Sequence, residues 1–132
     1  MNAESRDGEG LLYKQEAYAI VGAAMEIYNE LGTGFLEAVC QEALAVEMSA
    51  RGIPFREQVA IPIYYKNRQL QHVYRADYLV YDKIIVEIKA MRAMASTEEA
   101  QLLHYLRALH LRLGLLINFG HPGKLQWLRR VC

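Results

Sequence analysis

The hydrophobic pattern of this chain changes its period for the first time close to Pro54, and that change limits the folds open to it. Before Pro54 the apolar residues recur every three or four positions, as they do on one side of an amphipathic helix. Phe55–Tyr65 instead alternates apolar with polar residues, which is the period of a β-strand. Helical and strand patterns together in one short chain predict a single α/β domain.

The same patterns predict eight elements in the order α-α-β-β-β-α-β-β. Helices are expected over residues 13–31, 35–51 and 96–110, and strands over residues 55–65, 70–80, 83–90, 113–119 and 125–131. The run 113–119 is nearly all apolar, which is typical of a buried central strand. Pro62 cannot donate a backbone hydrogen bond, so the first strand is expected at a sheet edge or at a bulge. Ser96 and Glu99 have the spacing of a capping box that would begin the third helix.

The composition agrees with one domain and excludes several other classes of protein. The 132 residues are 53% hydrophobic and 23% charged, which is too apolar for an intrinsically disordered chain. Residues 1–10 are polar, so we expect a flexible N-terminal tail and one domain over residues 11–132. No apolar run approaches the roughly 18 residues of a membrane span, and no signal segment opens the chain. Cys40 and Cys132 are expected to be free thiols in a reducing, cytoplasmic setting.

The formal net charge of zero hides an uneven distribution along the chain. Residues 1–50 contain nine acidic and two basic residues, whereas residues 51–132 contain six acidic and thirteen basic residues. The halves therefore have net charges of −7 and +7. Such asymmetry indicates either a polyanionic partner for the basic half or two solvated faces that attract each other within the fold.

Three charged residues interrupt the apolar stretches of two neighbouring predicted strands, namely Asp77, Glu87 and Lys89. Glu87 and Lys89 are two residues apart, so they project from the same face of their strand. A charge in such a strand is costly unless it is paired or bound to a metal ion. A two-residue turn would set Asp77 opposite Val86. A three-residue turn over residues 81–83 would set Asp77 opposite Glu87 and Arg75 opposite Lys89.

The three-residue turn is favoured because it separates charged from apolar side chains. It would also place Tyr78 with Val86, and Ala76 with Ile88, on the apolar face. Two facing carboxylates, with Cβ atoms about 5 Å apart, repel unless a cation lies between them. Hard oxygen ligands of this kind suit Mg²⁺ or Mn²⁺. From the spacing alone, an ion-pair ladder on a solvated sheet face remains an open alternative.

Five short motifs occur in order along the chain: G-F-L-E-A-V-C at 34–40, R-A-D at 75–77, V-E-I-K-A at 86–90, E-A-Q-L-L-H-Y-L at 99–106 and G-L-L-I-N-F-G at 114–120. With these motifs the chain resembles, over about residues 11–131, the bacterial GxxExxY protein family, a branch of the PD-(D/E)XK nuclease superfamily. Gly34 and Glu37 match the motif that names the family, but Cys40 stands in place of its tyrosine. Ala76 stands where the superfamily has a proline before the aspartate.

The resemblance implies a restriction-endonuclease-like core, in which helices flank a mixed central β-sheet. It implies that Asp77 and Glu87 bind a Mg²⁺ or Mn²⁺ ion, with the carbonyl of Ile88 completing the site. Lys89 matches the catalytic lysine of the superfamily. Glu37 matches an acid that many members place beside the metal, which implies a part in metal binding and catalysis.

The helix expected over residues 96–110 adds two further matches. Gln101 and Tyr105 match the Q-x-x-x-Y element of RecB-like relatives, and residues four apart lie on one side of a helix. The resemblance implies that Gln101 holds a water or a phosphate oxygen near Lys89. It places Tyr105 among the substrate-binding residues.

The sequence therefore predicts a metal-dependent nuclease that hydrolyses phosphodiester bonds in DNA. Arg75, Arg92 and Arg107 are close to the motifs in sequence and are expected to neutralise flanking phosphates. The alternative is a non-catalytic nuclease-fold module that binds nucleic acid or a protein. A core of this size has little room for a separate recognition domain, so a homodimer or a protein partner is expected beside the nucleic acid.

Overall fold

The computed structural model describes residues 11–132, and the tail expected over residues 1–10 lies outside the described residues. The elements are α1 (Lys14–Leu31), α2 (Glu37–Ala50), β1 (Phe55–Tyr65), β2 (Arg68–Val80), β3 (Ile84–Lys89), α3 (Ser96–Leu109), β4 (Leu113–Asn118) and β5 (Gln126–Val131). Their order is the predicted one, and most boundaries lie within two residues of the expected positions. Both cysteines are free thiols, Cys40 buried and Cys132 exposed.

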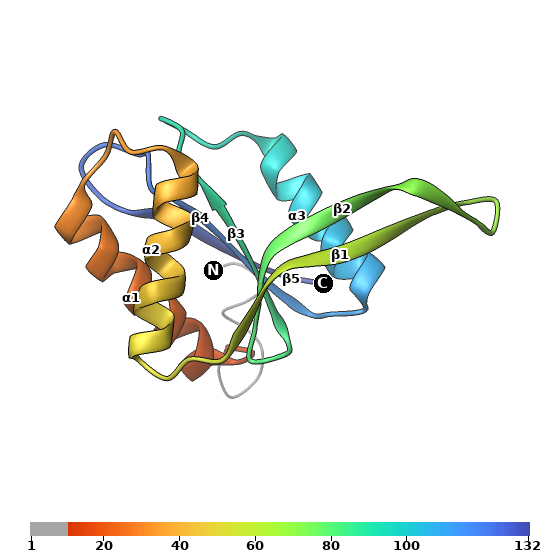
Figure 1. Ribbon diagram of the computed structural model, residues 1–132, viewed down its shortest axis with the longest axis horizontal. Helices are drawn as coiled ribbons and strands as arrows, with labels where there is room; N and C mark the ends of the chain where they lie inside the picture. The colour runs from red at the N-terminus through yellow and green to blue at the C-terminus, as the bar shows by residue number, and fades with distance from the viewer. Residues whose placement is uncertain (1–10) are drawn as a thin grey trace.

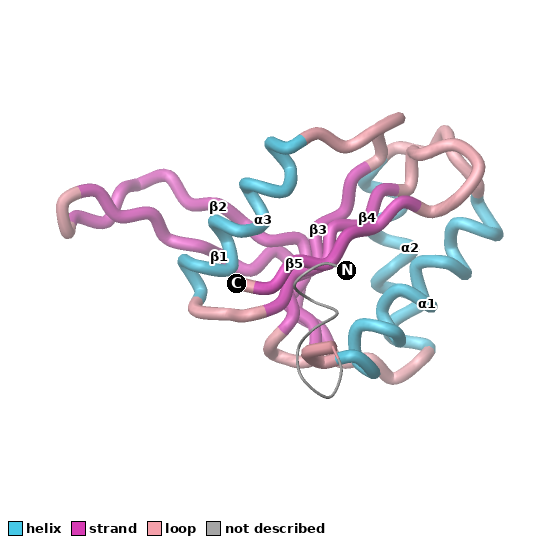
Figure 2. Tube along the Cα trace, turned by 180° about the vertical axis from the view of Figure 1, so that it is seen from behind, coloured by secondary structure: helices cyan, strands magenta, loops and turns pink. Residues whose placement is uncertain are grey.

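The five strands form one mixed sheet in the order β1-β2-β3-β4-β5 (Figures 1 and 2). Only β3 and β4 are parallel, and the chain connects them through α3. The other neighbours pair antiparallel. The structure thus confirms an α/β fold with a mixed central sheet flanked by helices, and it places β1 at an edge, as Pro62 predicts. The register of β1 against β2 also shifts between Pro62 and Tyr64, which is the expected irregularity.

Helices cover both faces of the sheet, and a hydrophobic cluster fills each interface. α1 and α2 pack on one face, over side chains that include Val86 and Ile88, while α3 packs on the other face, over Ile85 (Figure 1). Every residue of β4 is buried, so the nearly all-apolar run is an interior strand. Gly114 lets α3 approach this strand, because a Cβ there would lie 2.6 Å from the Leu102 side chain.

The turn between β2 and β3 contains three residues, as the charge pattern predicts. Tyr78 pairs with Val86 and Val80 with Ile84, so residues 81–83 form the connection. The predicted partnership of Ala76 with Ile88 is wrong, because Ala76 packs in the α3 cluster and Ile88 in the α1–α2 cluster. The alternation of β2 is therefore broken at Asp77, between Ala76 and Tyr78.

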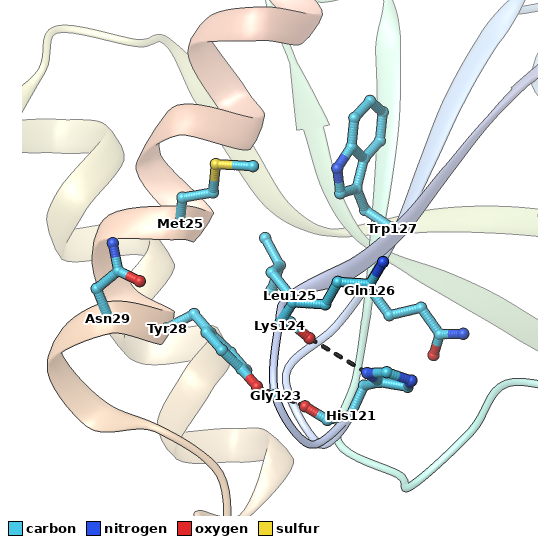
Figure 3. Close-up of a pocket in the computed structure, with 9 residues that line it drawn as sticks. All are labelled: Met25, Tyr28, Asn29, His121, Gly123, Lys124, Leu125, Gln126 and Trp127. Atoms are coloured by element: carbon cyan, nitrogen blue, oxygen red, sulfur yellow. Dashed lines mark hydrogen bonds between the residues drawn. The ribbon is translucent and has the colours of Figure 1, made fainter.

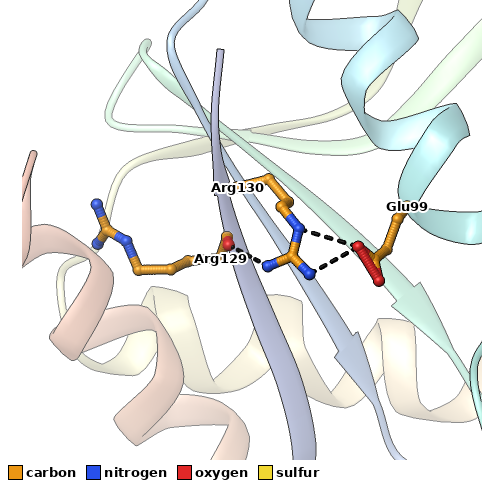
Figure 4. Close-up of polar contacts among 3 residues, drawn as sticks. All are labelled: Glu99, Arg129 and Arg130. Atoms are coloured by element: carbon orange, nitrogen blue, oxygen red, sulfur yellow. Dashed lines mark hydrogen bonds and ion pairs between the residues drawn. The ribbon is translucent and has the colours of Figure 1, made fainter. Parts of the chain in front are cut away.

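The start of α3 differs from the expected capping box. The N-cap position is Ala95, and the Glu98 side chain accepts a hydrogen bond from its N–H at 2.7 Å. Glu99 instead forms an ion pair with Arg130, whose Nη2 lies 2.6 Å from its Oε2 (Figure 4). This pair connects α3 to β5, two elements that are not neighbours in the chain.

The β1–β2 hairpin is longer than the rest of the sheet, and its outer part extends beyond the body of the molecule (Figures 1 and 2). Every residue from 64 to 75 is exposed, whereas Ala76 and residues 78–80 are buried. Within residues 11–132, none of the helices combines the length and apolar character needed to cross a membrane.

Candidate functional site

Asp77 on β2 and Glu87 on β3 each accept a hydrogen bond from the backbone of the other strand. They lie at the point where the backbone pairing of the two strands ends. The Asp77 N–H donates to Glu87 Oε2 at 2.6 Å, and the Ile88 N–H donates to Asp77 Oδ2 at 2.8 Å. Each carboxylate thus takes the place of a backbone acceptor in the ladder. The two acids lie opposite each other, as the three-residue turn predicts.

Glu87 is held almost entirely out of solvent, with 5% of its surface exposed. Burial, followed by the charge of Asp77, raises the pKa of Glu87 to about 8. The Asp77 N–H and the Lys89 ammonium act in the opposite direction. A buried carboxyl with a pKa this high is unusual outside functional sites, because burial disfavours its charged form.

Two further carboxyls belong to the same electrostatic group. Burial also raises the pKa of Asp77, against the lowering effects of the Ile88 N–H, Lys89 and Gln58. Burial raises the pKa of Glu37, at the start of α2, where Lys89 lowers it and Asp77 raises it. The structure therefore brings Glu37 within electrostatic range of the Asp77–Glu87 pair, with Lys89 as the cation common to all three acids.

Gln58 is a member of the site that the sequence does not single out. It lies in β1 between Glu57, the partner of Tyr78, and Val59, the partner of Ala76, so it is level with Asp77. Its side chain lowers the pKa of Asp77, and its backbone has a left-handed φ of 52° within β1. A glutamine rarely adopts this conformation, and such strain is concentrated at functional sites.

Asn118 at the end of β4 fixes the chain that leaves the site. It pairs with Lys89 across the parallel strands and is fully buried. Its amide accepts from the Met91 N–H at 2.9 Å and donates to the Met91 carbonyl at 2.7 Å. Gly120 packs against the same segment, since a Cβ there would lie 2.4 Å from the Met91 nitrogen.

The α3 residues of the predicted site lie on the side of the helix that faces the sheet. Tyr105 is 4% exposed, and burial, then Glu87 and Asp77, raise its pKa to about 12. Its ring lies 5.7 Å from that of Tyr74 on β2. Gln101 is half-buried one turn earlier on the same helix. Tyr105 is thus close to the two acids, and Gln101 lies about 40° around α3 from Tyr105, at about 100° per residue.

The three predicted phosphate-binding arginines are all exposed, but they are placed differently. The Arg75 Nη1 donates to the Gln58 carbonyl at 3.4 Å, so Arg75 lies beside the site. The predicted pairing of Arg75 with Lys89 does not occur among the described strands. Arg92 follows Met91 in the segment after β3. Arg107 is about 200° around α3 from Tyr105, at about 100° per residue, so the structure does not bring it to the carboxylates.

The donors at this site suit a hard divalent cation, but they are few. Asp77 and Glu87 supply two carboxylates, and the Ile88 carbonyl points to the Asp77 side of β3, because one strand residue directs its N–H and carbonyl to the same side. Among residues 11–132, no group of three or more His, Cys, Asp or Glu side chains is arranged to hold a metal ion. The structure thus offers two side-chain ligands, and Glu37 as a third stays a prediction.

A cavity of about 620 Å³ lies elsewhere, between α1 and the segment that precedes and begins β5 (Figure 3). Tyr28 closes one end by donating from its hydroxyl to the His121 carbonyl at 2.6 Å. None of the predicted site residues lines it. The candidate site is therefore the charged group at the point where the pairing of β2 with β3 ends.

A mixed sheet that places two acids and a lysine on adjacent strands, with helices on both faces, is the architecture of a nuclease-like α/β domain. The chain belongs to the PD-(D/E)XK nuclease superfamily, whose family model matches residues 14–131. Among curated proteins, none matches the chain significantly.

A solved structure supports the fold. The chain is similar to the protein of "Crystal structure of SSO0001", with a TM-score of 0.60 and 21% sequence identity over 90% of this chain. The match covers 57% of that protein, so this chain spans little more than half its length. At this identity the likeness is one of fold alone.

Proposed function

We propose that this protein is a metal-dependent nuclease of the GxxExxY branch, which hydrolyses phosphodiester bonds in DNA. Its active-site residues in this proposal are Asp77, Glu87 and Lys89. The observation that supports the proposal most is the reciprocal hydrogen bonding of Asp77 and Glu87, which sets two desolvated carboxylates face to face. Superfamily membership adds independent support. Gly34 and Glu37 support the branch.

A bound Mg²⁺ or Mn²⁺ would polarise the scissile phosphate and lower the pKa of a water molecule. Asp77 and Glu87, with the Ile88 carbonyl, are the residues that would hold it. Because the pKa of Glu87 is about 8 without metal, ionising this acid at neutral pH means releasing a proton, and metal affinity should rise with pH.

Lys89 acts on the substrate side of the pair in this proposal. It is two residues after Glu87, so its ammonium projects from the same face of β3. There it orients the attacking water and stabilises the negative charge that develops on the phosphate oxygens. Gln101 holds the water, and Arg75 binds a neighbouring phosphate.

Cleavage of DNA in Mg²⁺ or Mn²⁺ tests the proposal directly. Single-stranded and duplex substrates are incubated with wild type, Lys89→Ala and Glu87→Ala, and with Lys124→Ala as the matched control on an exposed lysine outside the site. Each site variant should lose cleavage by about 100-fold or more, while the control retains it. Equal cleavage by all four proteins would identify a contaminant and contradict the proposal.

A non-catalytic role is the second candidate, and the small number of ligands favours it. With two side-chain carboxylates and no third ligand grouped with them among the described residues, the pair could serve the fold alone. Calorimetric titration with Mn²⁺ separates the two functions. Binding that disappears in Asp77→Asn supports the nuclease, whereas absence of binding in wild type supports the non-catalytic module.

A further inference from the structure

The outer part of the β1–β2 hairpin, residues 64–75, forms an arm whose composition differs from that of the whole chain. It contains three cations, Lys66, Arg68 and Arg75, and no acidic residue. The four ion pairs among the described residues involve none of these cations. The arm therefore has a charge of +3 on a chain whose total is zero.

The arm also exposes aromatic rings. Tyr64 and Tyr65 near the tip are 62% and 61% exposed, and Tyr74 near the base is 44% exposed. The Lys66 ammonium lies 5.5 Å from the centre of the Tyr65 ring, so a cation and a ring occupy the same place at the tip. Interleaved cations and exposed rings form the surface that proteins use to bind single-stranded nucleic acid.

The arm is continuous with the candidate site. Arg75 is two residues from Asp77 and is held beside it by the Gln58 carbonyl. The Tyr74 ring packs at 5.7 Å from that of Tyr105, whose pKa responds to Glu87 and Asp77. From Arg68 to Ala76, β2 spans roughly 30 Å at about 3.4 Å per residue. A strand with one phosphate at the site could therefore follow the arm to its tip.

We propose that this arm binds a single-stranded segment of DNA that leads away from the site, with Lys66, Arg68 and Arg75 on phosphates and the tyrosine rings on bases. The proposal rests on DNA being the partner of the proposed nuclease. A single strand fits better than a duplex because the faces of paired bases are covered by their neighbours, so exposed tyrosines can stack only on unpaired bases.

Fluorescence anisotropy with a labelled oligonucleotide, in EDTA so that no cleavage occurs, tests the arm. Lys66→Glu combined with Arg68→Glu should weaken single-strand binding by at least tenfold. Tyr64→Ala combined with Tyr65→Ala should weaken it by about thirtyfold or more, because the variant loses two stacked bases. All four side chains are exposed, so circular dichroism should show an unchanged fold. Arg112→Glu is the matched control, because Arg112 is an exposed arginine immediately before β4, and this variant should bind as wild type.

The salt dependence gives a second readout of the same variants. Each phosphate contact to a single strand contributes about −0.7 to the slope of log K against log salt. The Lys66 and Arg68 double variant should therefore lose about 1.4 of the slope, whereas the tyrosine variant should keep the wild-type slope. If both double variants changed the slope equally, the assignment of the cations to phosphates and of the tyrosines to bases would be wrong.

Several results would overturn the proposal. Wild-type affinity in both arm variants, equal weakening in Arg112→Glu, or tighter binding of duplex than of single strand would each do so. A dimer that becomes monomeric in the arm variants, with DNA affinity unchanged, would assign the arm to a second copy of the chain. Cleavage is scored separately. Arm-dependent binding by a protein that cuts no DNA supports the role of the arm and contradicts the nuclease. Cleavage by a protein whose DNA binding does not depend on the arm supports the nuclease and contradicts the role of the arm.

Discussion

Glu87 is the residue whose protonation couples the site to the stability of the fold. Its pKa is raised from 4.5 to about 8 in the folded state, so the folded protein binds this proton more tightly than the unfolded chain. Its contribution to stability is then fully present below about pH 4.5 and is lost as the pH rises through about 8. The raised pKa values of Asp77 and Glu37 act in the same direction.

Metal-free protein should therefore lose stability as the pH rises from about 5 to 8. The expected slope from Glu87 is at most about 1.4 kcal/mol per pH unit, measured by urea denaturation in EDTA. Glu87→Gln keeps an oxygen for the Asp77 N–H but cannot titrate, so it should flatten this slope, whereas Glu26→Gln on the exposed side of α1 should not. An identical slope in wild type and Glu87→Gln would contradict the raised pKa.

Gln58 should show opposite effects on stability and activity. Gln58→Gly relieves a left-handed φ of 52° and is expected to raise the free energy of unfolding by about 1 kcal/mol. It also removes the side chain that lowers the pKa of Asp77, so DNA cleavage should fall several-fold. Denaturation and cleavage are measured on the same preparation. A variant that is more stable and equally active would show that Gln58 does not position Asp77.

Among the individual residues of the site, the sequence predicts the charged Asp77, Glu87 and Lys89 but misses the uncharged Gln58. Asp77, Glu87 and Lys89 stand out because charges are costly within apolar strands. Gln58 in an alternating strand has the pattern of any solvent-facing side chain, and its left-handed backbone arises only when β1 pairs with β2. The placement of Ala76 on the face that packs against α3 has the same origin. The residue types of β2 do not indicate this break in alternation, so the sequence does not predict it.

Among the elements, the junction of β3 with the segment after it depends on β4. Asn118 and Gly120 fix the Met91 backbone, which immediately follows Lys89 and Ala90. The Phe119 N–H also donates to the Lys89 carbonyl at 2.8 Å. The end of β4 therefore fixes the direction in which the chain leaves the sheet after β3.

Gly120→Ala should disturb this junction. Its Cβ would lie 2.4 Å from the Met91 nitrogen and 2.7 Å from the Ala90 carbonyl carbon, and backbone atoms cannot move as freely as a side chain. We expect a loss of about 2 kcal/mol in unfolding free energy and reduced cleavage. Gly22→Ala is the control, because its nearest neighbour is the end of the flexible Arg51 side chain at 3.4 Å and alanine favours a helix. Wild-type stability in Gly120→Ala would contradict this role.

The elements themselves are largely predictable, because period, apolar runs and turn residues determine them. The capping box is not, since Ser96 with Glu99 and Ala95 with Glu98 differ by one residue, and tertiary contacts decide between them. Glu99 is drawn to Arg130 of β5 (Figure 4), a partner 31 positions away that no local pattern indicates.

For the whole molecule, metal binding should appear as stabilisation. Three acids with raised pKa values lie near one lysine, so a divalent cation relieves repulsion in the folded state only. Added Mn²⁺ at a hundred times its dissociation constant should raise the unfolding free energy by about 2.7 kcal/mol, seen as a higher melting temperature at pH 8. Asp77→Asn should abolish the shift, and an equal shift in Asp77→Asn would place the ion elsewhere.

The acidic and the basic half of the chain also form different parts of the fold. Of the residues that the structure describes, the acidic half forms the α1–α2 layer, while the basic half forms the sheet, α3 and the arm. Among the described residues, two ion pairs join the two halves, Lys83 with Glu16 at 2.8 Å and Arg51 with Glu47 at 2.7 Å. The arm is not predictable from composition, because its exposure depends on β1 and β2 being longer than the strands beside them.

Diffraction from a crystal soaked in Mn²⁺ tests the central claim most directly. We expect an anomalous peak between Asp77 and Glu87, about 2.1 Å from an oxygen of each, with the Ile88 carbonyl as a further ligand. A crystal with no peak there, in which both carboxylates still accept hydrogen bonds from the Asp77 and Ile88 N–H groups, would contradict the metal site and with it the nuclease.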